Sequence, residues 1–491
     1  MGYLIKNKLL GTLLLFFTIH VYGQNASFHK VFSGNGYDKA LGVAQLADSS
    51  YLITGSSSSF DDAPSQAFLL SLSKTGTYQW SKAYGGTEFE EGVRVLPVAG
   101  LGNYIIGSSS SGVSANFDAV VYFTDVAGNL IWEKHFDNGG WERISDALLL
   151  SDTSIIMVGE TDATNSGNPD IYMLRIDKTG AINWTMQMGT PGVDRLTSIE
   201  KTSDTTFVVA GTLYNQDSLL NKAYVAHYHT NSALDWEVNL GAKGAFTIND
   251  IVVSVADILV VGEGIQTGKT DFDAFRANIS FTGIINLTEE GYVPESVRYG
   301  QVVRYNSTAG PKHFVASQLI NASYPTFASG EDAFIFRYDG SFYWNNYGVG
   351  YSGIGQDQFN HMINTLDGYA IAVGMHTFYG AGGSSAMVVK IGDDTSFPPF
   401  LASPLVENLV DITENLNTNS VVVSPNPFQE TLKISTHSFG NTVTVFDTVG
   451  EMYATYHFDD YLELNTEMWA SGVYFLHFTT EKGASLIKVV K

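Results

Sequence analysis

The sequence predicts an all-β protein, with a seven-bladed β-propeller in residues 24–391 and a small C-terminal β-sandwich in residues 420–491. Three observations predict this fold. A large apolar anchor, aromatic in six of seven units, recurs about every 52 residues, four short strand-like runs fill each period, and no window shows a sustained helical pattern. Seven units of four strands are a usual size for a propeller. The anchors are Phe28, Trp80, Trp132, Trp184, Trp236, Leu287 and Trp344.

Residues 1–23 precede the repeats and have the organisation of a secretory signal peptide. Lys6 and Lys8 come before an apolar run from Leu9 to Val21, and Gly23 ends the segment. This run is short for a membrane-spanning helix, which needs roughly 20 residues. We expect cleavage after Gly23 and no transmembrane segment in the mature chain; a retained anchor is the alternative.

Each repeat contains four strand-like runs separated by turn residues. In the second unit the runs are 92–98, 103–108, 118–124 and 130–136. Short β-branched and aromatic runs between clusters of Gly, Ser, Asn and Asp are typical of strands. The pattern therefore predicts one four-stranded blade per repeat.

Two kinds of small residue keep the same phase as the anchors. The second strand carries Gly55, Gly107, Gly159, Gly211, Gly262 and Gly374, with Ala316 in the sixth unit. Glycine in a strand is typical of a bulge or a close backbone approach, and we expect it to let neighbouring blades pack tightly. The third strand begins with Ala67, Ala119, Ala223, Ala274, Ala333 and Ala386.

The two ends of the repeat region predict how the ring closes. After Trp344 the chain supplies only three more strands, the last at 386–391. The strand around Phe28 has no blade of its own, so we expect it to complete the last blade and remove two exposed sheet edges. The tryptophans then lie on outer strands, where their rings fill space between blades.

Composition excludes several classes of function. The chain has 26 basic and 50 acidic residues, a net charge of −24, which disfavours binding to nucleic acid. It has no cysteine, so disulfides, thiolate metal sites and cysteine nucleophiles are excluded. Residues 392–419 lose the periodicity and contain Pro398, Pro399 and Pro404, which predicts an extended linker.

The last segment carries a set of spaced motifs on six strand-like runs, at 431–435, 442–447, 452–458, 461–464, 473–479 and 484–490. The motifs are Ser424-Pro425-Asn426-Pro427-Phe428, Leu432 with Ile434, Val445 to Gly450, Gly472-Val473-Tyr474-Phe475-Leu476 and Lys488-Val489-Val490-Lys491. Together they resemble the type A sorting domain of the Bacteroidetes type IX secretion system. The propeller region more loosely resembles secreted bacterial β-propeller repeat proteins.

The resemblance implies a route and a partner. It implies that the outer-membrane type IX machinery recognises residues 420–491 after the chain has reached the periplasm, and that the protein ends on the cell surface or is released. Lys488 and Lys491 are basic residues in an acidic chain, which suits a sorting signal that a receptor recognises. A C-terminal sandwich used for adhesion is the alternative.

One polar feature recurs just before the innermost strand of the blades. Its members are Asp38, Glu90, Glu142, Asp194 and Asp357. If they ring the mouth of the central channel, they could hold a ligand or a weakly bound calcium ion, because calcium takes several oxygen ligands. The structural alternative is that each carboxylate accepts backbone N–H groups of its own turn. No other cofactor is expected.

An enzymatic function requires catalytic side chains that lie close together in the fold. Glu295, Arg298, Tyr299 and His361 come from neighbouring blades and could meet near the channel. No motif of a hydrolase, metalloprotease or phosphate-binding loop is present. We therefore expect a non-enzymatic binding or scaffold module at the cell surface, with an unidentified protein or glycan ligand. The alternative is a polysaccharide-acting hydrolase or lyase with its site at the channel mouth.

Overall fold

The computed structural model describes residues 27–60, 64–111, 116–163, 167–241, 244–266, 273–290, 296–307, 310–320, 331–339, 348–351, 356–377, 383–391, 405–407, 422–435, 441–446, 452–480 and 483–491. The expected signal peptide, Trp344, Glu295 and Gly450 lie outside these residues. Within the described part of the chain there is no helix with the length and apolar character that a membrane crossing demands.

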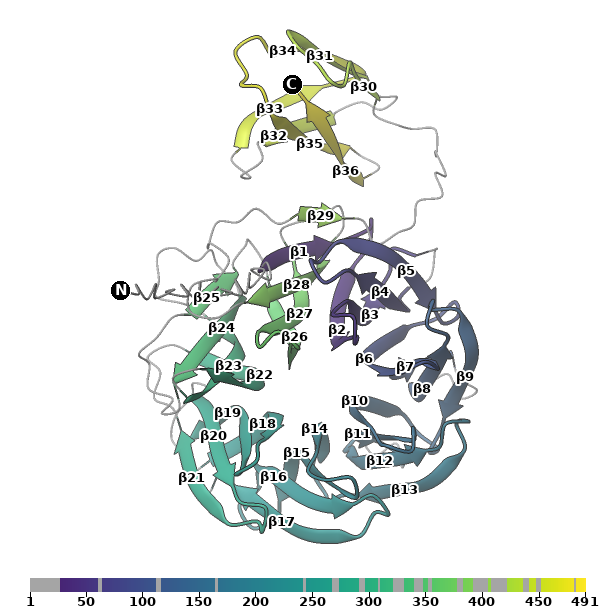
Figure 1. The fold of residues 1–491 in the computed structure, drawn as a ribbon, viewed down its shortest axis with the longest axis vertical. Helices are drawn as coiled ribbons and strands as arrows, with labels where there is room; N and C mark the ends of the chain where they lie inside the picture. The colour runs from purple at the N-terminus through teal and green to yellow at the C-terminus, as the bar shows by residue number, and fades with distance from the viewer. Residues whose placement is uncertain are drawn as a thin grey trace, which may run out of the picture.

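Seven sheets follow one another around a central axis in chain order, as the sequence predicts (Figure 1). Blade 1 contains β2 (Asp38–Gln45), β3 (Tyr51–Ser57), β4 (Gln66–Leu72) and β5 (Tyr78–Tyr84). Blade 2 contains β6 (Glu90–Val98), β7 (Gly102–Ser109), β8 (Asp118–Thr124) and β9 (Leu130–Phe136). Blade 3 contains β10 (Glu142–Leu149), β11 (Ile155–Thr161), β12 (Asp170–Ile176) and β13 (Ile182–Met188).

The second half of the ring repeats this order. Blade 4 contains β14 (Arg195–Lys201), β15 (Thr206–Asn215), β16 (Leu220–His229) and β17 (Leu234–Leu240). Blade 5 contains β18 (Gly244–Val253), β19 (Ile258–Gln266), β20 (Asp273–Ile279) and β21 (Ile285–Glu290). Blade 6 contains β22 (Ser296–Ser307), β23 (Gly310–Ile320), β24 (Glu331–Asp339) and β25 (Gly348–Tyr351). Blade 7 contains β26 (Gln358–Asn364), β27 (Ala370–His376), β28 (Ser385–Ile391), β1 (Phe28–Phe32) and β29 (Leu405–Glu407).

The apolar core lies between blades, because each sheet covers the face of the next. Every residue of β4 is buried, whereas β9 on the rim is mostly exposed or half-buried. One cluster joins Tyr51 and Phe68 of blade 1 to Ile371 and Val388 of blade 7. Strands buried on both faces, such as β4, read as nearly continuous apolar runs, whereas inner strands such as β14 and outer strands such as β9 show mixed polarity.

The ring closes where the sequence predicts. β1 pairs antiparallel with β28, from Phe28 opposite Lys390 to Phe32 opposite Ala386. The ring of Phe28 also takes the place of a tryptophan anchor, because it lies against Gly76 in a turn of blade 1 just as Trp80 lies against Gly128 in blade 2. The described anchors Phe28, Trp80 and Trp236 each lie against a turn of the next blade and fill space between blades, which confirms the packing role expected of them.

The segment expected to be a linker contributes a further strand. β29, within residues 392–419, runs parallel to β1, with Val31 opposite Val406. The sequence predicts an extended linker here, and β29 is a short strand that it did not predict. The physical reason is that β1 would otherwise present an unpaired edge, and the strand begins at Leu405, directly after the last proline.

The recurrent glycines serve a different purpose from the one expected. A Cβ at Gly159 on β11 would lie 1.9 Å from the carbonyl oxygen of Arg143 on β10 of the same blade. At this place β10 has a bulge between Ile144 and Asp146. The glycines therefore accommodate the inner strand's bulge within each blade and not the contact between blades.

Blade 6 departs from this glycine pattern by one position. Its bulge lies between Tyr299 and Gln301, so Ser317, and not Ala316, occupies the position opposite the residue before the bulge. The assignment of Ala316 to the glycine series is therefore wrong.

Residues 422–491 form a separate β-sandwich. One sheet contains β30 (Val422–Ser424), β31 (Thr431–Ser435) and β34 (Tyr461–Asn465). The other contains β33 (Met452–Phe458), β32 (Asn441–Phe446), β35 (Val473–Thr480) and β36 (Gly483–Val490). Phe428, Trp469 and Tyr474 lie in its core. The six expected strands are present, and β30 is an additional one.

Candidate functional site

The central channel contains a cavity of about 470 Å³ lined by the innermost strands of all seven blades. Each inner strand has a β-bulge, and the residue directly after the bulge lies where its side chain can reach the neighbouring blades. The residues directly after the bulges are Gly42, Arg94, Asp146, Ser198, Asp250, Gln301 and His361. The first five follow one another at 52 residues, so the bulge is part of the repeat.

Five of these residues, Arg94, Asp146, Ser198, Asp250 and His361, make hydrogen bonds between neighbouring blades. The Arg94 Nε donates to Asp146 Oδ1 at 2.6 Å, and Asp146 Oδ2 accepts the backbone N–H of Ile199 at 2.9 Å. The Ser198 hydroxyl donates to Asp250 Oδ1 at 2.9 Å, and Asp250 Oδ2 accepts from the backbone N–H of Val302 at 2.8 Å. Each carboxylate therefore bridges its own blade to the next.

His361 continues this arrangement across the closure of the ring. Its Nδ1 accepts the backbone N–H of Val43 at 3.0 Å, which joins blade 7 to blade 1. Burial, followed by the nearby Arg94 guanidinium, holds the pKa of His361 well below 6.5. The imidazole is therefore neutral near pH 7, and the nitrogen that could accept a proton already binds the backbone.

Two acidic groups of the channel, Asp250 and Glu200, have raised pKa values. Burial raises the pKa of Asp250 to about 7; its bond from Val302 opposes the rise, and Asp146 adds to it. Burial, Asp250 and Asp146 also raise the pKa of Glu200. Because the Glu200 side chain is open to the channel, water moderates this second effect.

The five recurrent carboxylates lie inside their blades. Asp38, Glu90, Glu142, Asp194 and Asp357 are each 0% exposed, and the described residues that line the channel cavity include none of them. This placement corrects the expectation of a carboxylate ring open to the channel mouth. The inner strand begins at or next to each carboxylate, and the side chain turns back onto the same blade's second strand.

Their partners are hydroxyl groups and loop N–H groups. Asp38 Oδ1 accepts the Ser57 hydroxyl at 2.5 Å, and its Oδ2 accepts the Gly34 N–H at 2.7 Å. Glu142 Oε1 accepts the Thr161 hydroxyl at 2.7 Å, and Asp194 Oδ1 accepts the Tyr214 N–H at 2.6 Å. Burial raises the pKa of Asp38, Glu142 and Asp194.

The other two carboxylates of the series follow the same pattern. Glu90 accepts the Ser109 hydroxyl at 3.4 Å and the Ser111 hydroxyl. Asp357 Oδ1 accepts the Thr377 N–H at 3.1 Å. Binding of a cation by the series as a whole stays a prediction.

The residues considered for catalysis are only partly described. Arg298 and Tyr299 lie on β22 before its bulge, opposite Gln318 and Ser317, and their side chains lie outside the described part. His361 lies on β26 after the bulge, and its Nδ1 accepts the backbone N–H of Val43.

The sorting-domain motifs meet around the C-terminus. Asn426 Oδ1 accepts the backbone N–H of Val490 at 2.9 Å. Gly472 exchanges two backbone hydrogen bonds with Lys491, of 3.2 and 2.8 Å. The Tyr474 hydroxyl donates to the Ala470 carbonyl at 2.8 Å.

Lys491 has an internal contact of its own. Its Nζ donates to the carbonyls of Thr466, Glu467 and Trp469. The motifs therefore fasten β36, and Lys491 is bound within the domain. Pro425 and Pro427 flank Asn426, and the side chain of Lys488 lies outside the described residues.

Sequence reasoning missed the inter-blade bridges. Their signal was present, because Arg94, Asp146, Ser198 and Asp250 share the 52-residue spacing of the anchors. Their chemical types differ from blade to blade, so the series does not stand out as a repeated residue.

The chain combines a β-propeller with a secretion domain. Residues 422–491 match the family model of the secretion system C-terminal sorting domain. The chain therefore carries a type IX secretion sorting domain behind a β-propeller, and it is secreted or exposed at the cell surface. The sorting domain implies interaction with the type IX machinery. No curated protein matches the chain.

Solved structures resemble the fold at low identity. Sqt1 from Chaetomium thermophilum is 12% identical with a TM-score of 0.44, covering 75% of this chain and 100% of that chain. The WD40 domain of Neurospora crassa Pan2 is 12% identical with a TM-score of 0.42, covering 74% of this chain and 98% of that chain.

A bacterial surface protein also resembles the chain. PorZ, a surface component of the type IX secretion system of Porphyromonas gingivalis, is 11% identical with a TM-score of 0.35, covering 92% of this chain and 81% of that chain. None of these likenesses supports a statement about ligands.

Proposed function

We propose that the propeller acts outside the outer membrane as a non-enzymatic binding or scaffold module. The supporting observation is the use of polar groups around the channel. Hydrogen bonds between blades engage Arg94, Asp146, Asp250 and His361. These polar groups of the channel therefore stabilise the fold. A general acid or base needs a group free to exchange a proton, and the best placed histidine is committed to the backbone.

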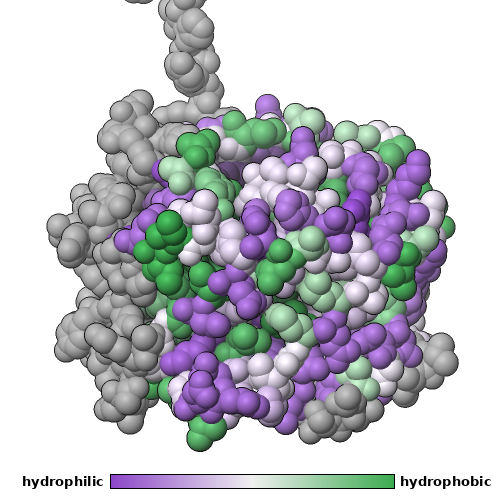
Figure 2. All heavy atoms as spheres, turned by 90° about the horizontal axis from the view of Figure 1, so that it is seen from below, coloured by the Kyte–Doolittle hydropathy of each residue, from purple (hydrophilic) through white to green (hydrophobic). Residues whose placement is uncertain are grey.

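The rim offers the apolar surface that a binding module needs. The first residues of the outer strands recur in phase, and Leu130, Ile182, Leu234 and Ile285 are 48, 55, 50 and 43% exposed. Figure 2, seen from below Figure 1, shows apolar side chains scattered among polar ones. A surface of this mixed kind is typical of non-obligate interfaces, which are about as apolar as other protein surfaces.

The test uses purified protein on a glycan array and against the proteins secreted by the producing bacterium. The rim variant changes Leu130, Ile182 and Leu234 to Ser. The control changes Leu101, Leu219 and Val255, apolar residues in hairpin turns that are as exposed as the rim residues or more so, to Ser. We expect a retained glycan or protein that the control keeps and the rim variant loses.

The same preparation is assayed for polysaccharide cleavage. We expect no new sugar ends. Cleavage that Glu295→Gln abolishes in a folded protein would establish the hydrolase or lyase instead. Failure to retain any glycan or secreted protein would contradict a binding role.

A further inference from the structure

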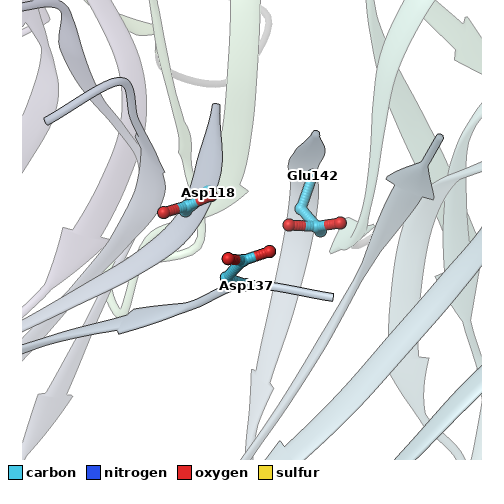
Figure 3. A group of neighbouring side chains, drawn as sticks. All are labelled: Asp118, Asp137 and Glu142. Carbon is cyan, nitrogen blue, oxygen red and sulfur yellow. The ribbon is translucent and has the colours of Figure 1, made fainter. Parts of the chain in front are cut away.

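Three carboxylates converge where blade 2 meets blade 3. Asp118 is the first residue of β8, Asp137 directly follows β9, and Glu142 is the first residue of β10. One oxygen from each lies within 4.8 Å of the others, and Figure 3 shows the Glu142 carboxylate turned towards the two aspartates. Blade 2 supplies two of the groups and blade 3 the third.

The cluster is a departure from the repeat and not a copy of it. The positions one and two periods after Asp137 are Gly189 and Gly241, and the position one period before it is Gly85. At Gly85 a Cβ would lie 2.5 Å from Glu90 Oε2, so a side chain at this position points at the recurrent carboxylate. Asp137 therefore places a second acid against Glu142 at this junction.

Glu142 has an oxygen that the protein leaves unsatisfied. The residue is 0% exposed, and its Oε1 accepts the Thr161 hydroxyl. Its Oε2 is buried without a hydrogen-bond partner; the nearby N–H of Asn138 favours the charge but makes no bond of normal geometry to this oxygen. A buried carboxylate oxygen without a donor is costly unless a cation or proton reaches it.

The corresponding place at another junction holds a positive charge. Lys222 stands two periods after Asp118, and it is buried at 8% exposure. Its Nζ donates to the carbonyls of Gly241 and Gly244 at 2.9 and 2.7 Å, in the loop that joins blade 4 to blade 5. The Lys222 ammonium group thus supplies a positive charge that joins blade 4 to blade 5, and a bound metal ion would supply such a charge between blades 2 and 3.

We propose that Asp118, Asp137 and Glu142 bind a hard divalent cation, calcium in particular, and thereby fasten blade 2 to blade 3. Calcium takes about six to eight oxygen ligands in a flexible geometry, which three carboxylates and water can supply. Asp137 is exposed, so the ion can enter from solvent on its side. Asp118 and Glu142 are buried and bind the ion from the protein interior. Affinities of extracellular calcium modules are about 10⁻⁴ to 10⁻³ M, and the site suits that range.

The test measures metal binding and stability in the full protein. Terbium, which replaces calcium, is excited through Trp141, the residue before Glu142. We expect terbium luminescence that calcium displaces, and a melting temperature that millimolar calcium raises by a few degrees. Asp137→Gly, which installs the residue found at the other junctions, abolishes both responses.

A second measurement separates the ion from a general effect of charge. In chelator, Asp137→Gly melts at or above the wild-type temperature, because it removes a like charge from the cluster. Asp170→Asn, at the equivalent of Asp118 in the next junction, keeps the calcium and terbium responses. Calcium responses that are absent in the wild type, or unchanged in Asp137→Gly, overturn the proposal.

Discussion

The glycine in the second strand of six of the seven blades shows how one missing side chain determines local geometry. Gly55, Gly107, Gly159 and Gly374 would each place a Cβ within 1.7 to 1.9 Å of a carbonyl oxygen on the inner strand. Real Cβ atoms do not approach backbone oxygens so closely. An added methyl group must therefore displace the bulge, and the bulge in turn positions the residue that bridges to the next blade.

We predict that Gly159→Ala lowers the free energy of unfolding by about 2 to 4 kcal/mol, the range of overpacking and backbone strain. Gly300→Ala is the matched control, because it lies on a bulge but its Cβ would meet nothing nearer than 3.4 Å. Urea unfolding of the two variants measures the difference. Equal losses in both would contradict the assignment of the effect to Arg143.

The sequence predicts residue positions better than residue contacts. The 52-residue spacing placed Trp80 and Trp236 on outer strands and Glu142 at the start of an inner strand. It did not reveal that the Glu142 side chain turns into its blade, because the spacing of residues along the chain does not specify which way a side chain faces. The proximity of Asp118 to Asp137 depends on the path of a loop, which no periodicity specifies.

At the level of elements, β1 is the strand on which closure depends. Val31 is fully buried and pairs with Met387 on one side and Val406 on the other. β1 makes five pairs with β28 but only three with β29. The two neighbours of β1 therefore contribute unequally to the last blade.

Proline substitution separates the two contributions. Val31→Pro removes a backbone donor from a strand paired on both sides, and we expect a loss of about 3 kcal/mol or more. Val406→Pro makes the same change on the short edge strand, and we expect a loss below about 1 kcal/mol. Thermal unfolding compares the two variants. A larger loss in Val406→Pro would show that β29, and not β1, secures the ring.

Closure was predictable from the sequence and β29 was not. The count of strands after the last anchor left one strand missing, which only the segment around Phe28 could supply. Leu405 to Glu407 offers three residues between prolines and an acidic stretch, too short a run to be recognised as a strand.

At the scale of the whole molecule, the burial of a carboxyl group beside the channel makes stability depend on pH. The pKa of Asp250 is about 7 in the folded state against 3.8 in its ordinary range. The folded protein thus binds this proton more tightly than the unfolded chain. The contribution of this proton to the free energy of unfolding is fully present below pH 3.8. It declines as the pH rises and is lost above about pH 7.

We predict that the free energy of unfolding attributable to Asp250 falls between pH 4 and pH 7, by about 1.4 kcal/mol for each unit of pKa shift at most. Asp250→Asn cannot titrate and should flatten this slope. Urea unfolding at several pH values measures it, with the exposed Asp204→Asn as control. An unchanged slope in Asp250→Asn would show that Asp250 titrates normally.

The pairing of β1 with β28 has a consequence for the order of events in a cell. The first residues of the ring to be synthesised can pair only when Ala386 to Lys390 have been made, more than 350 residues later. Contacts so distant along the chain form slowly. During synthesis the propeller therefore stays open, and it can close into a ring only after its final blade has been made.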